Sequence, residues 1–111
     1  MTRLLLLLLI LANPATATLN IVVSIKPIHS IVSNITQGVS NPLLLLDSNQ
    51  SAHHFNLKPS QLSLIENANL VVAIHPQMEE GLNKALSNLA PEKIFYISSY
   101  EEHEEHEEHE E

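Results

Sequence analysis

Short apolar runs and helical apolar patterns alternate along the body of the chain. Residues 20–25, 43–46, 70–74 and 93–97 are runs rich in Ile, Val and Leu, a composition typical of buried strands. The run 43–46 is apolar at every position, as in strands of parallel sheets that are covered on both faces. After the first run, apolar residues recur with helical spacing at Ile28, Ile31, Val32, Ile35 and Val39.

Two further helices are predicted between the remaining strands. The first opens at Pro59, with Ser60 expected as its N-cap. Its apolar stripe consists of Leu62, Ile65 and Ala68. The second covers residues 77–89, and its apolar face consists of Met78, Leu82, Ala85, Leu86 and Leu89. The order β-α-β-α-β-α-β predicts an α/β fold with a parallel, doubly wound sheet, which forms a single lobe over residues 18–98.

The segment before this body has the organisation of a signal peptide. Arg3 gives a short positive region, residues 4–12 are uninterrupted apolar, and residues 15–17 (Ala-Thr-Ala) provide a small-x-small cleavage pattern. The apolar stretch is far shorter than the roughly 20 residues that span a bilayer as a helix. We therefore expect residues 1–17 to be removed and the protein to be periplasmic in a Gram-negative cell, not embedded in the membrane. A retained membrane anchor is the alternative interpretation.

The net charge of −8 is located entirely in the tail, predicted to be disordered over residues 99–111. Residues 101–111 contain eight Glu and neither Lys nor Arg, whereas the rest of the chain has five acidic and five basic residues. The body therefore has no basic excess, which argues against nucleic-acid binding. The chain has no Cys, so any metal must be held by His, Asp or Glu.

Histidines of the body follow the predicted strands. In a doubly wound sheet, ligands bind at the carboxyl ends of the strands. His29 lies in the turn after the first strand, His53 and His54 in the loop 47–56 after the second, and His75 directly after the third. The sequence therefore places all four at one edge of the sheet.

Several segments of the body resemble one protein family. Residues 23–30 (Val-Ser-Ile-Lys-Pro-Ile-His-Ser) resemble the opening strand and helix of the periplasmic solute-binding receptors of zinc-uptake ABC transporters. Residues 51–55 (Ser-Ala-His-His-Phe) are similar to their Ser-Pro-His-x-Tyr/Phe loop, and residues 57–60 (Leu-Lys-Pro-Ser) to the segment after it. Residues 66–72 (Glu-Asn-Ala-Asn-Leu-Val-Val) resemble their Asn-Ala-Asp-Leu-Val run, and residues 78–79 the start of their next helix.

The resemblance extends to the Glu/His tail, which is similar to the charged, His-rich loop of the zinc-specific branch. It implies a receptor of two α/β lobes that holds zinc between them, largely through His, and delivers it to an ATPase-driven membrane permease. This chain corresponds to the N-terminal lobe, and the family's remaining ligands come from beyond the His-rich loop.

The same resemblance implies individual ligands. By motif register, His53 is the first zinc ligand, although Ala52 stands where the family usually has Pro. The adjacent His54 is a second candidate, and His75, at a position that is usually small, a third. His29 is expected to pack or cap rather than ligate.

The tail is a candidate metal-binding segment in its own right. His103, His106 and His109 recur every third residue among carboxylates, a pattern that offers both imidazole nitrogens and a favourable field for a cation. We expect a weak site for several ions. A solubilising acidic tail is the alternative. Imidazole favours zinc over manganese, which prefers carboxylate-rich sites.

The leading hypothesis is thus that the chain is a truncated substrate-binding component that captures zinc for an ABC importer. The alternatives are a stand-alone periplasmic zinc buffer or metallochaperone that acts through the tail, and a non-functional gene fragment. An enzyme ranks last, because the sequence has no His-Glu-x-x-His, Gly-x-Ser-x-Gly or Gly-rich phosphate motif.

Overall fold

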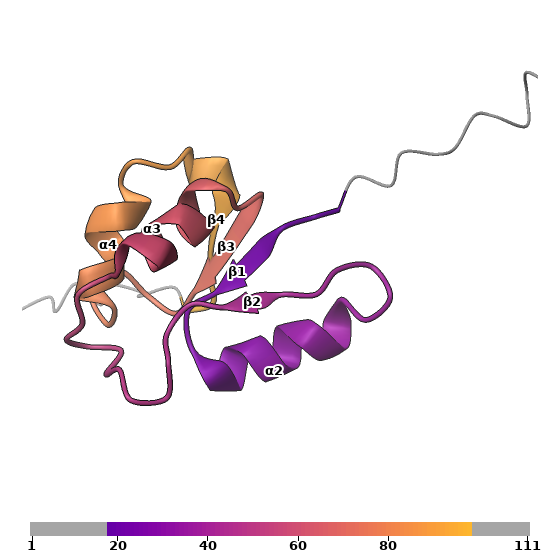
Figure 1. Cartoon of the computed structure of the whole chain (residues 1–111), viewed down its shortest axis with the longest axis horizontal. Helices are drawn as coiled ribbons and strands as arrows, with labels where there is room; N and C mark the ends of the chain where they lie inside the picture. The colour runs from indigo at the N-terminus through magenta and orange to yellow at the C-terminus, as the bar shows by residue number, and fades with distance from the viewer. Residues whose placement is uncertain (1–17, 99–111) are drawn as a thin grey trace, which may run out of the picture.

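The computed structural model describes residues 18–98, which form a four-stranded sheet with helices on both faces (Figure 1). All neighbouring strands pair in parallel, in the order β2-β1-β3-β4. The strands are β1 (Ile21–Val23), β2 (Leu43–Leu44), β3 (Leu70–Ala73) and β4 (Ile94–Tyr96). The predicted parallel, doubly wound α/β fold is confirmed.

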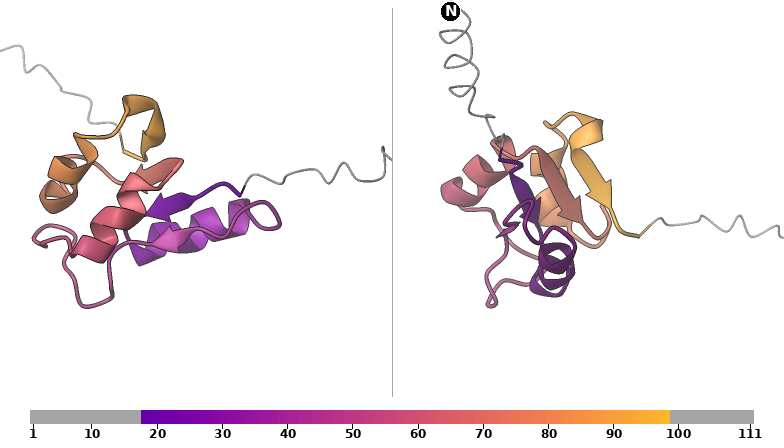
Figure 2. Two further views of the ribbon diagram at one scale, coloured as in Figure 1. Left: turned by 45° about the horizontal axis from the view of Figure 1, so that its top comes forward. Right: turned by 90° about the vertical axis from the view of Figure 1, so that its right-hand side faces the viewer.

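The helices form two unequal layers. The helix α2 (Lys26–Ile35) lies on one face of the sheet, and α3 (Pro59–Glu66) and α4 (Glu80–Leu86) lie on the other (Figures 1 and 2). A 3₁₀ turn, Pro91–Lys93, precedes β4. In the part of the chain that the structure describes, no helix is both long and apolar enough to cross a bilayer.

Alternation along the strands divides the core between the two faces. Val22 and Val71 point toward α3 and α4, where they join the larger apolar cluster. The residues next to them along the strands, Ile21, Val23 and Val72, point toward α2 and form a smaller cluster. This alternation follows from the period of two in a β-strand, and both faces are apolar because both are covered.

Two local predictions were wrong. Ser60 is not the N-cap of α3, because Pro59 occupies the first helical position and Lys58 the cap. Gln61 stabilises that start by accepting a hydrogen bond from the Lys58 backbone N–H at 2.8 Å. Met78 does not lie on the buried face of α4. It precedes the helix in a turn, where its own backbone N–H donates to the His75 carbonyl at 3.1 Å. Its side chain is 43% exposed.

The second strand is shorter and less covered than predicted. It comprises two residues at the edge of the sheet, and Leu43 is 46% exposed. The next two residues, Leu45 and Leu46, are buried but lie beyond the strand. Their N–H groups still donate to the carbonyls of Val23 and Ser24, at 2.8 and 3.0 Å. An edge strand has one neighbour only, so an all-apolar run need not be fully covered.

Candidate metal-binding edge of the sheet

The carboxyl ends of the strands lead into the segments that contain the body histidines. From β1 the chain first goes to β2 on one side and later returns to β3 on the other. The switch point of this topology therefore lies between the ends of β1 and β3, where such sheets bind ligands. The His-bearing loop, residues 47–56, leaves β2 next to it.

His53 and His54 line one hollow of the surface. The other lining residues are Phe55 and Asn56 from the same loop, and Glu80 and Gly81 from the first turn of α4. Both imidazoles are exposed, as is Glu80. The lining of the hollow therefore includes two imidazoles and one carboxylate, and zinc binds both donor types.

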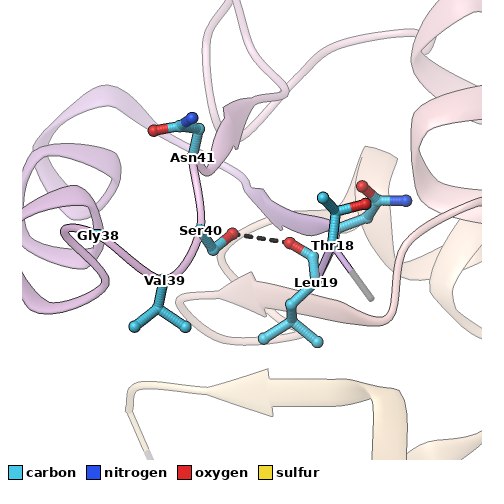
Figure 3. A pocket seen from close by; sticks show the side chains of 7 residues that line it. Thr18, Leu19, Gly38, Val39, Ser40 and Asn41 are labelled. Atoms are coloured by element: carbon cyan, nitrogen blue, oxygen red, sulfur yellow. Dashed lines mark hydrogen bonds between the residues drawn. The ribbon is translucent and has the colours of Figure 1, made fainter. Parts of the chain in front are cut away.

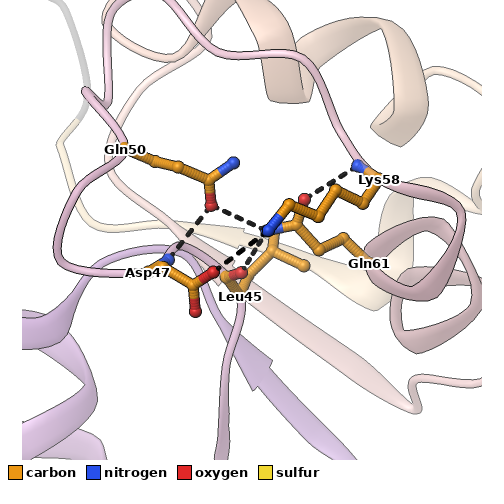
Figure 4. Close-up of polar contacts among 5 residues, drawn as sticks. All are labelled: Leu45, Asp47, Gln50, Lys58 and Gln61. Carbon is orange, nitrogen blue, oxygen red and sulfur yellow. Dashed lines mark hydrogen bonds and ion pairs between the residues drawn. The ribbon is translucent and has the colours of Figure 1, made fainter.

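A buried glutamine holds the start of the His-bearing loop (Figure 4). Gln61, only 6% exposed, donates from Nε2 to the Leu45 carbonyl at 2.7 Å and to Gln50 Oε1 at 2.9 Å. Gln50 Oε1 also accepts from the Asp47 backbone N–H at 3.1 Å. The ion pair between Lys58 and Asp47, at 3.5 Å, is largely exposed and adds little stability. Helix α3 thus anchors the loop through one side chain.

Phe55 anchors the other end of this loop. Its side chain is partly buried and packs against the larger apolar cluster, on the α3 and α4 face. His53 and His54 therefore project from a short stretch between two attachment points.

His29 and His75 make local contacts instead of joining this hollow. The Nε2 of His29, half-buried, donates to the Pro42 carbonyl at 2.8 Å. The Nδ1 of His75, also half-buried, accepts a hydrogen bond from the Gln77 backbone N–H at 3.2 Å. His75 is not among the residues that line the hollow of His53.

Residues 18–98 alone do not assemble a complete site. Within them, no three His, Asp or Glu side chains are grouped so that they could hold a metal ion. Zinc sites usually use three or four protein ligands. His103, His106 and His109 lie outside the described residues, as do the predicted signal peptide and the rest of the tail.

A buried carboxylate near the switch point was not expected from the sequence. Glu79 is 1% exposed, and its Oε2 accepts a hydrogen bond from the Ile74 backbone N–H at 2.7 Å. Its Oε1 is buried and has no hydrogen-bond partner among the described residues, and the same is true of Ser24 Oγ. Burial and then the charge of Glu79 raise the pKa of Tyr96 above its ordinary value of 10.0. The sequence gives no sign that Glu79 is buried, because it stands next to Glu80 at the start of a helix, where acidic residues are usually exposed.

Another hollow lies at the opposite end of β1 and has a different character (Figure 3). It is lined by Thr18, Leu19, Asn20, Gly38, Val39, Ser40 and Asn41. The Ser40 hydroxyl donates to the Leu19 carbonyl at 2.7 Å. None of these side chains is a titratable metal ligand, and the hollow is at the amino end of the strand. This second hollow is therefore not an alternative metal-binding site to the hollow lined by His53 and His54.

Comparison with known proteins settles the family. The family profile described as zinc-uptake complex component A, periplasmic (ZnuA), matches residues 21–111. The chain belongs to this family. The high-affinity zinc uptake system protein ZnuA of Brucella abortus is 45% identical over 69 residues, 62% of this chain and 21% of its own length. The Yersinia pestis protein of the same name is 36% identical over 91 residues, 81% of this chain and 29% of its own.

Solved structures share the fold. Zn(II)-bound AdcA from Streptococcus pneumoniae superposes with a TM-score of 0.61 at 23% identity, over 73% of this chain and 18% of its own. A Mn-bound periplasmic metal binding protein from Candidatus Liberibacter asiaticus gives 0.65 at 22% identity, over 72% of this chain and 30% of its own. The chain spans between about a fifth and a third of the length of the two curated ZnuA proteins from Brucella abortus and Yersinia pestis.

Proposed function

We propose that this chain captures zinc in the periplasm for an ABC-type importer, as a substrate-binding component, and that His53 is its first zinc ligand. Membership of the ZnuA family supports the substrate and the transport role. The observation that supports the ligand assignment is the shared hollow, whose lining includes His53, His54 and Glu80. The relatives are named as zinc-uptake proteins and not as enzymes.

Zinc is the proposed cargo ahead of manganese. Two imidazoles in one hollow favour zinc, since manganese prefers sites rich in carboxylate and carbonyl oxygen. Further ligands must come from outside residues 18–98, since those residues contain no complete set. We propose that His75 is a local contact rather than a ligand, and that His54 is the alternative to His53. The partner that receives the ion is a membrane permease.

A second function, zinc buffering by the tail, rests on a different observation. His103, His106 and His109 recur among eight Glu in residues 101–111. Such a tail would bind zinc weakly and several ions at a time, with no need for His53. In this alternative the body serves only as a carrier.

Zinc titration against a competing chelator separates the two functions. The parent for the measurement is the full chain after signal cleavage with His103, His106 and His109 changed to Ala, so that the body histidines are titrated alone. We expect one weakly bound zinc per chain in this parent, because residues 18–98 supply an incomplete ligand set that water completes. Binding should be at least about tenfold weaker in His53→Ala than in the matched His54→Ala variant. Manganese should compete poorly in the same assay.

Each outcome assigns the binding to one part of the molecule. Loss of all binding in the tail variant would support the buffer and overturn the receptor site. Equal losses of zinc affinity in His53→Ala and His54→Ala would mean that both histidines, and not one alone, bind the metal. Unchanged binding in both would remove the loop from the site altogether.

A further inference from the structure

The backbone of Phe55 rests directly on the first turn of α4. The contact is at Gly81, the second residue of that helix. A Cβ atom at Gly81 would overlap the Phe55 carbonyl oxygen, and would lie 3.3 Å from the carbonyl carbon and 3.5 Å from Cδ1 of the ring. The first of these contacts involves backbone, which cannot swing away as the end of a flexible side chain can. Any side chain at Gly81 must therefore displace the loop, the helix, or both.

The other glycine of the chain has a different role. Gly38 adopts a φ of +81° in the turn after α2, a conformation that glycine accepts at little cost. A Cβ atom at Gly38 would meet nothing within 4 Å. Gly38 is therefore needed for its backbone conformation, whereas Gly81 is needed for close approach. The two residues form a natural matched pair for mutation.

The loop has little freedom to absorb a displacement at Phe55. Its start is held by the hydrogen bonds of Gln61, and the Phe55 ring packs against the apolar core. His53 and His54 directly precede Phe55 in the chain, and all three line the same hollow as Gly81. A shift of the Phe55 carbonyl is thus passed to the imidazoles, because the chain on both sides of them is anchored.

We propose that Gly81 is a positioning residue for the metal site. Its missing side chain lets the His-bearing loop dock on α4, and this docking sets where the His53 imidazole stands relative to the Glu80 carboxylate. The inference rests on the proposed zinc site at His53. It adds a residue with no donor atom of its own, which acts through the loop backbone.

The test compares Gly81→Ala with Gly38→Ala in the full chain with the three tail histidines changed to Ala. Groups that orient metal ligands typically contribute 10- to 100-fold to metal affinity. We expect Gly81→Ala to weaken zinc binding at least about tenfold in the chelator assay. Gly38→Ala should bind zinc as the parent does, although its positive φ makes it less stable. Circular dichroism on each sample reports the folded fraction, so the affinity is compared between folded chains.

A second measurement needs no glycine variant. In the same tail-substituted chain, Co²⁺ in place of zinc broadens the amide resonances of nearby residues in a two-dimensional NMR spectrum. The two glycine amides provide an internal comparison. We expect the Gly81 resonance to be lost on Co²⁺ binding and the Gly38 resonance to remain. If Gly81→Ala does not fold, this comparison still tests whether the metal lies beside α4, as the positioning role requires.

The failure of this inference and that of the proposed function give different results. If His53→Ala binds zinc as its parent does, the proposed site is wrong. If His53→Ala loses affinity while a folded Gly81→Ala retains it, only the positioning role is overturned. A Gly81 amide that stays sharp when Co²⁺ is bound overturns the positioning role as well, because the metal then does not lie beside α4.

Discussion

On one face of the sheet, α3 and α4 cover a large apolar core, whereas on the other α2 covers a small one. Eight buried residues, with seven partly buried ones packed around them, form the first cluster. The second has three buried residues and three partly buried ones. The helix α2 has no buried residue at all, although its apolar stripe is the clearest in the sequence. A strong helical pattern therefore identifies a helix but does not measure how much of it is buried.

The difference follows from how much sheet a single helix can cover. Ile28 and Val32 of α2 pack against the smaller cluster. The rest of the predicted stripe is not covered by residues 18–98. On α2, Ile31 is 56% exposed and Ile35 76%, and Val39, in the turn after the helix, is 76% exposed. The sheet also extends beyond α2, since Phe95 on β4 is 57% exposed. The α2 face is thus the thinner half of the molecule, and Ile35 is, with Val39, the most exposed large apolar side chain among the described residues.

The largest effect is expected from the core of the α3 and α4 face. Leu82 is fully buried in the larger cluster, and Leu82→Ala would leave a cavity there. We expect a loss of about 2–5 kcal/mol in the free energy of unfolding, measured by urea denaturation of the full chain. Such a loss is a large part of the stability of a small domain. A loss below about 1 kcal/mol would contradict the unequal layers.

Val32→Ala probes the thinner face, from the helix that covers it. Val32 is only partly buried, and it packs against three buried residues rather than eight. We expect a loss of about 1 kcal/mol or less by the same denaturation measurement. If Val32→Ala proves as costly as Leu82→Ala, the two faces contribute equally and the comparison above fails.

The sequence predicted the architecture because each part of it is a local signal. The short apolar runs and the helical spacing both depend on the neighbouring residues, and they identified the four strands and the three α-helices in order. The 3₁₀ turn before β4 was not predicted. The ends of elements were less well predicted. Met78 fits the apolar spacing of α4, yet the hydrogen bonds of the turn after His75 delay the helix to Glu80. Such competition between a turn and a helix depends on tertiary contacts.

The candidate site was predicted only in part. The topology rule and the motif register predicted that His53 and His54 lie together after the second strand, and both line one hollow. Neither could show that Glu80 lines the same hollow, since Glu80 is distant from them in sequence. Gly81 gave no signal, because the need for glycine arises from a backbone that comes from another part of the chain. The burial of Glu79 was invisible for the same reason.

A smaller effect on stability is expected from the bare part of α2. Ile35→Ser replaces a side chain that is 76% exposed, so the free energy of unfolding should change by no more than about 0.5 kcal/mol. Exposed apolar surface promotes association, however. We therefore expect Ile35→Ser to reduce self-association of the chain in sedimentation velocity experiments. Equal self-association of Ile35→Ser and the parent would show that Ile35 on the α2 face does not contribute to association.

The smallest effect concerns the polar groups within the thicker layer, and it changes with pH only in the alkaline range. Tyr96 packs against the larger cluster, and burial, with the Glu79 charge second, raises its pKa above 10.0. A raised folded pKa means that the contribution to stability is complete below pH 10.0 and is lost as the pH rises through the folded value. Ultraviolet titration in a Tyr100→Phe background, which leaves one tyrosine, should therefore give a midpoint above 10.0.

Glu79→Gln should lower that midpoint without returning it fully to 10.0, because burial, the larger cause, remains. Glutamine keeps an oxygen that can accept from the Ile74 N–H, so the turn before α4 is retained while the charge is removed. Glu80→Gln is the matched control: Glu80 is exposed and is not a cause of the Tyr96 shift. A midpoint that moves equally in both variants would mean that general surface charge, and not the carboxylate buried beneath α4, acts on Tyr96. A midpoint that moves only in Glu79→Gln places that charge inside the well-covered face, where the solvent screens it least.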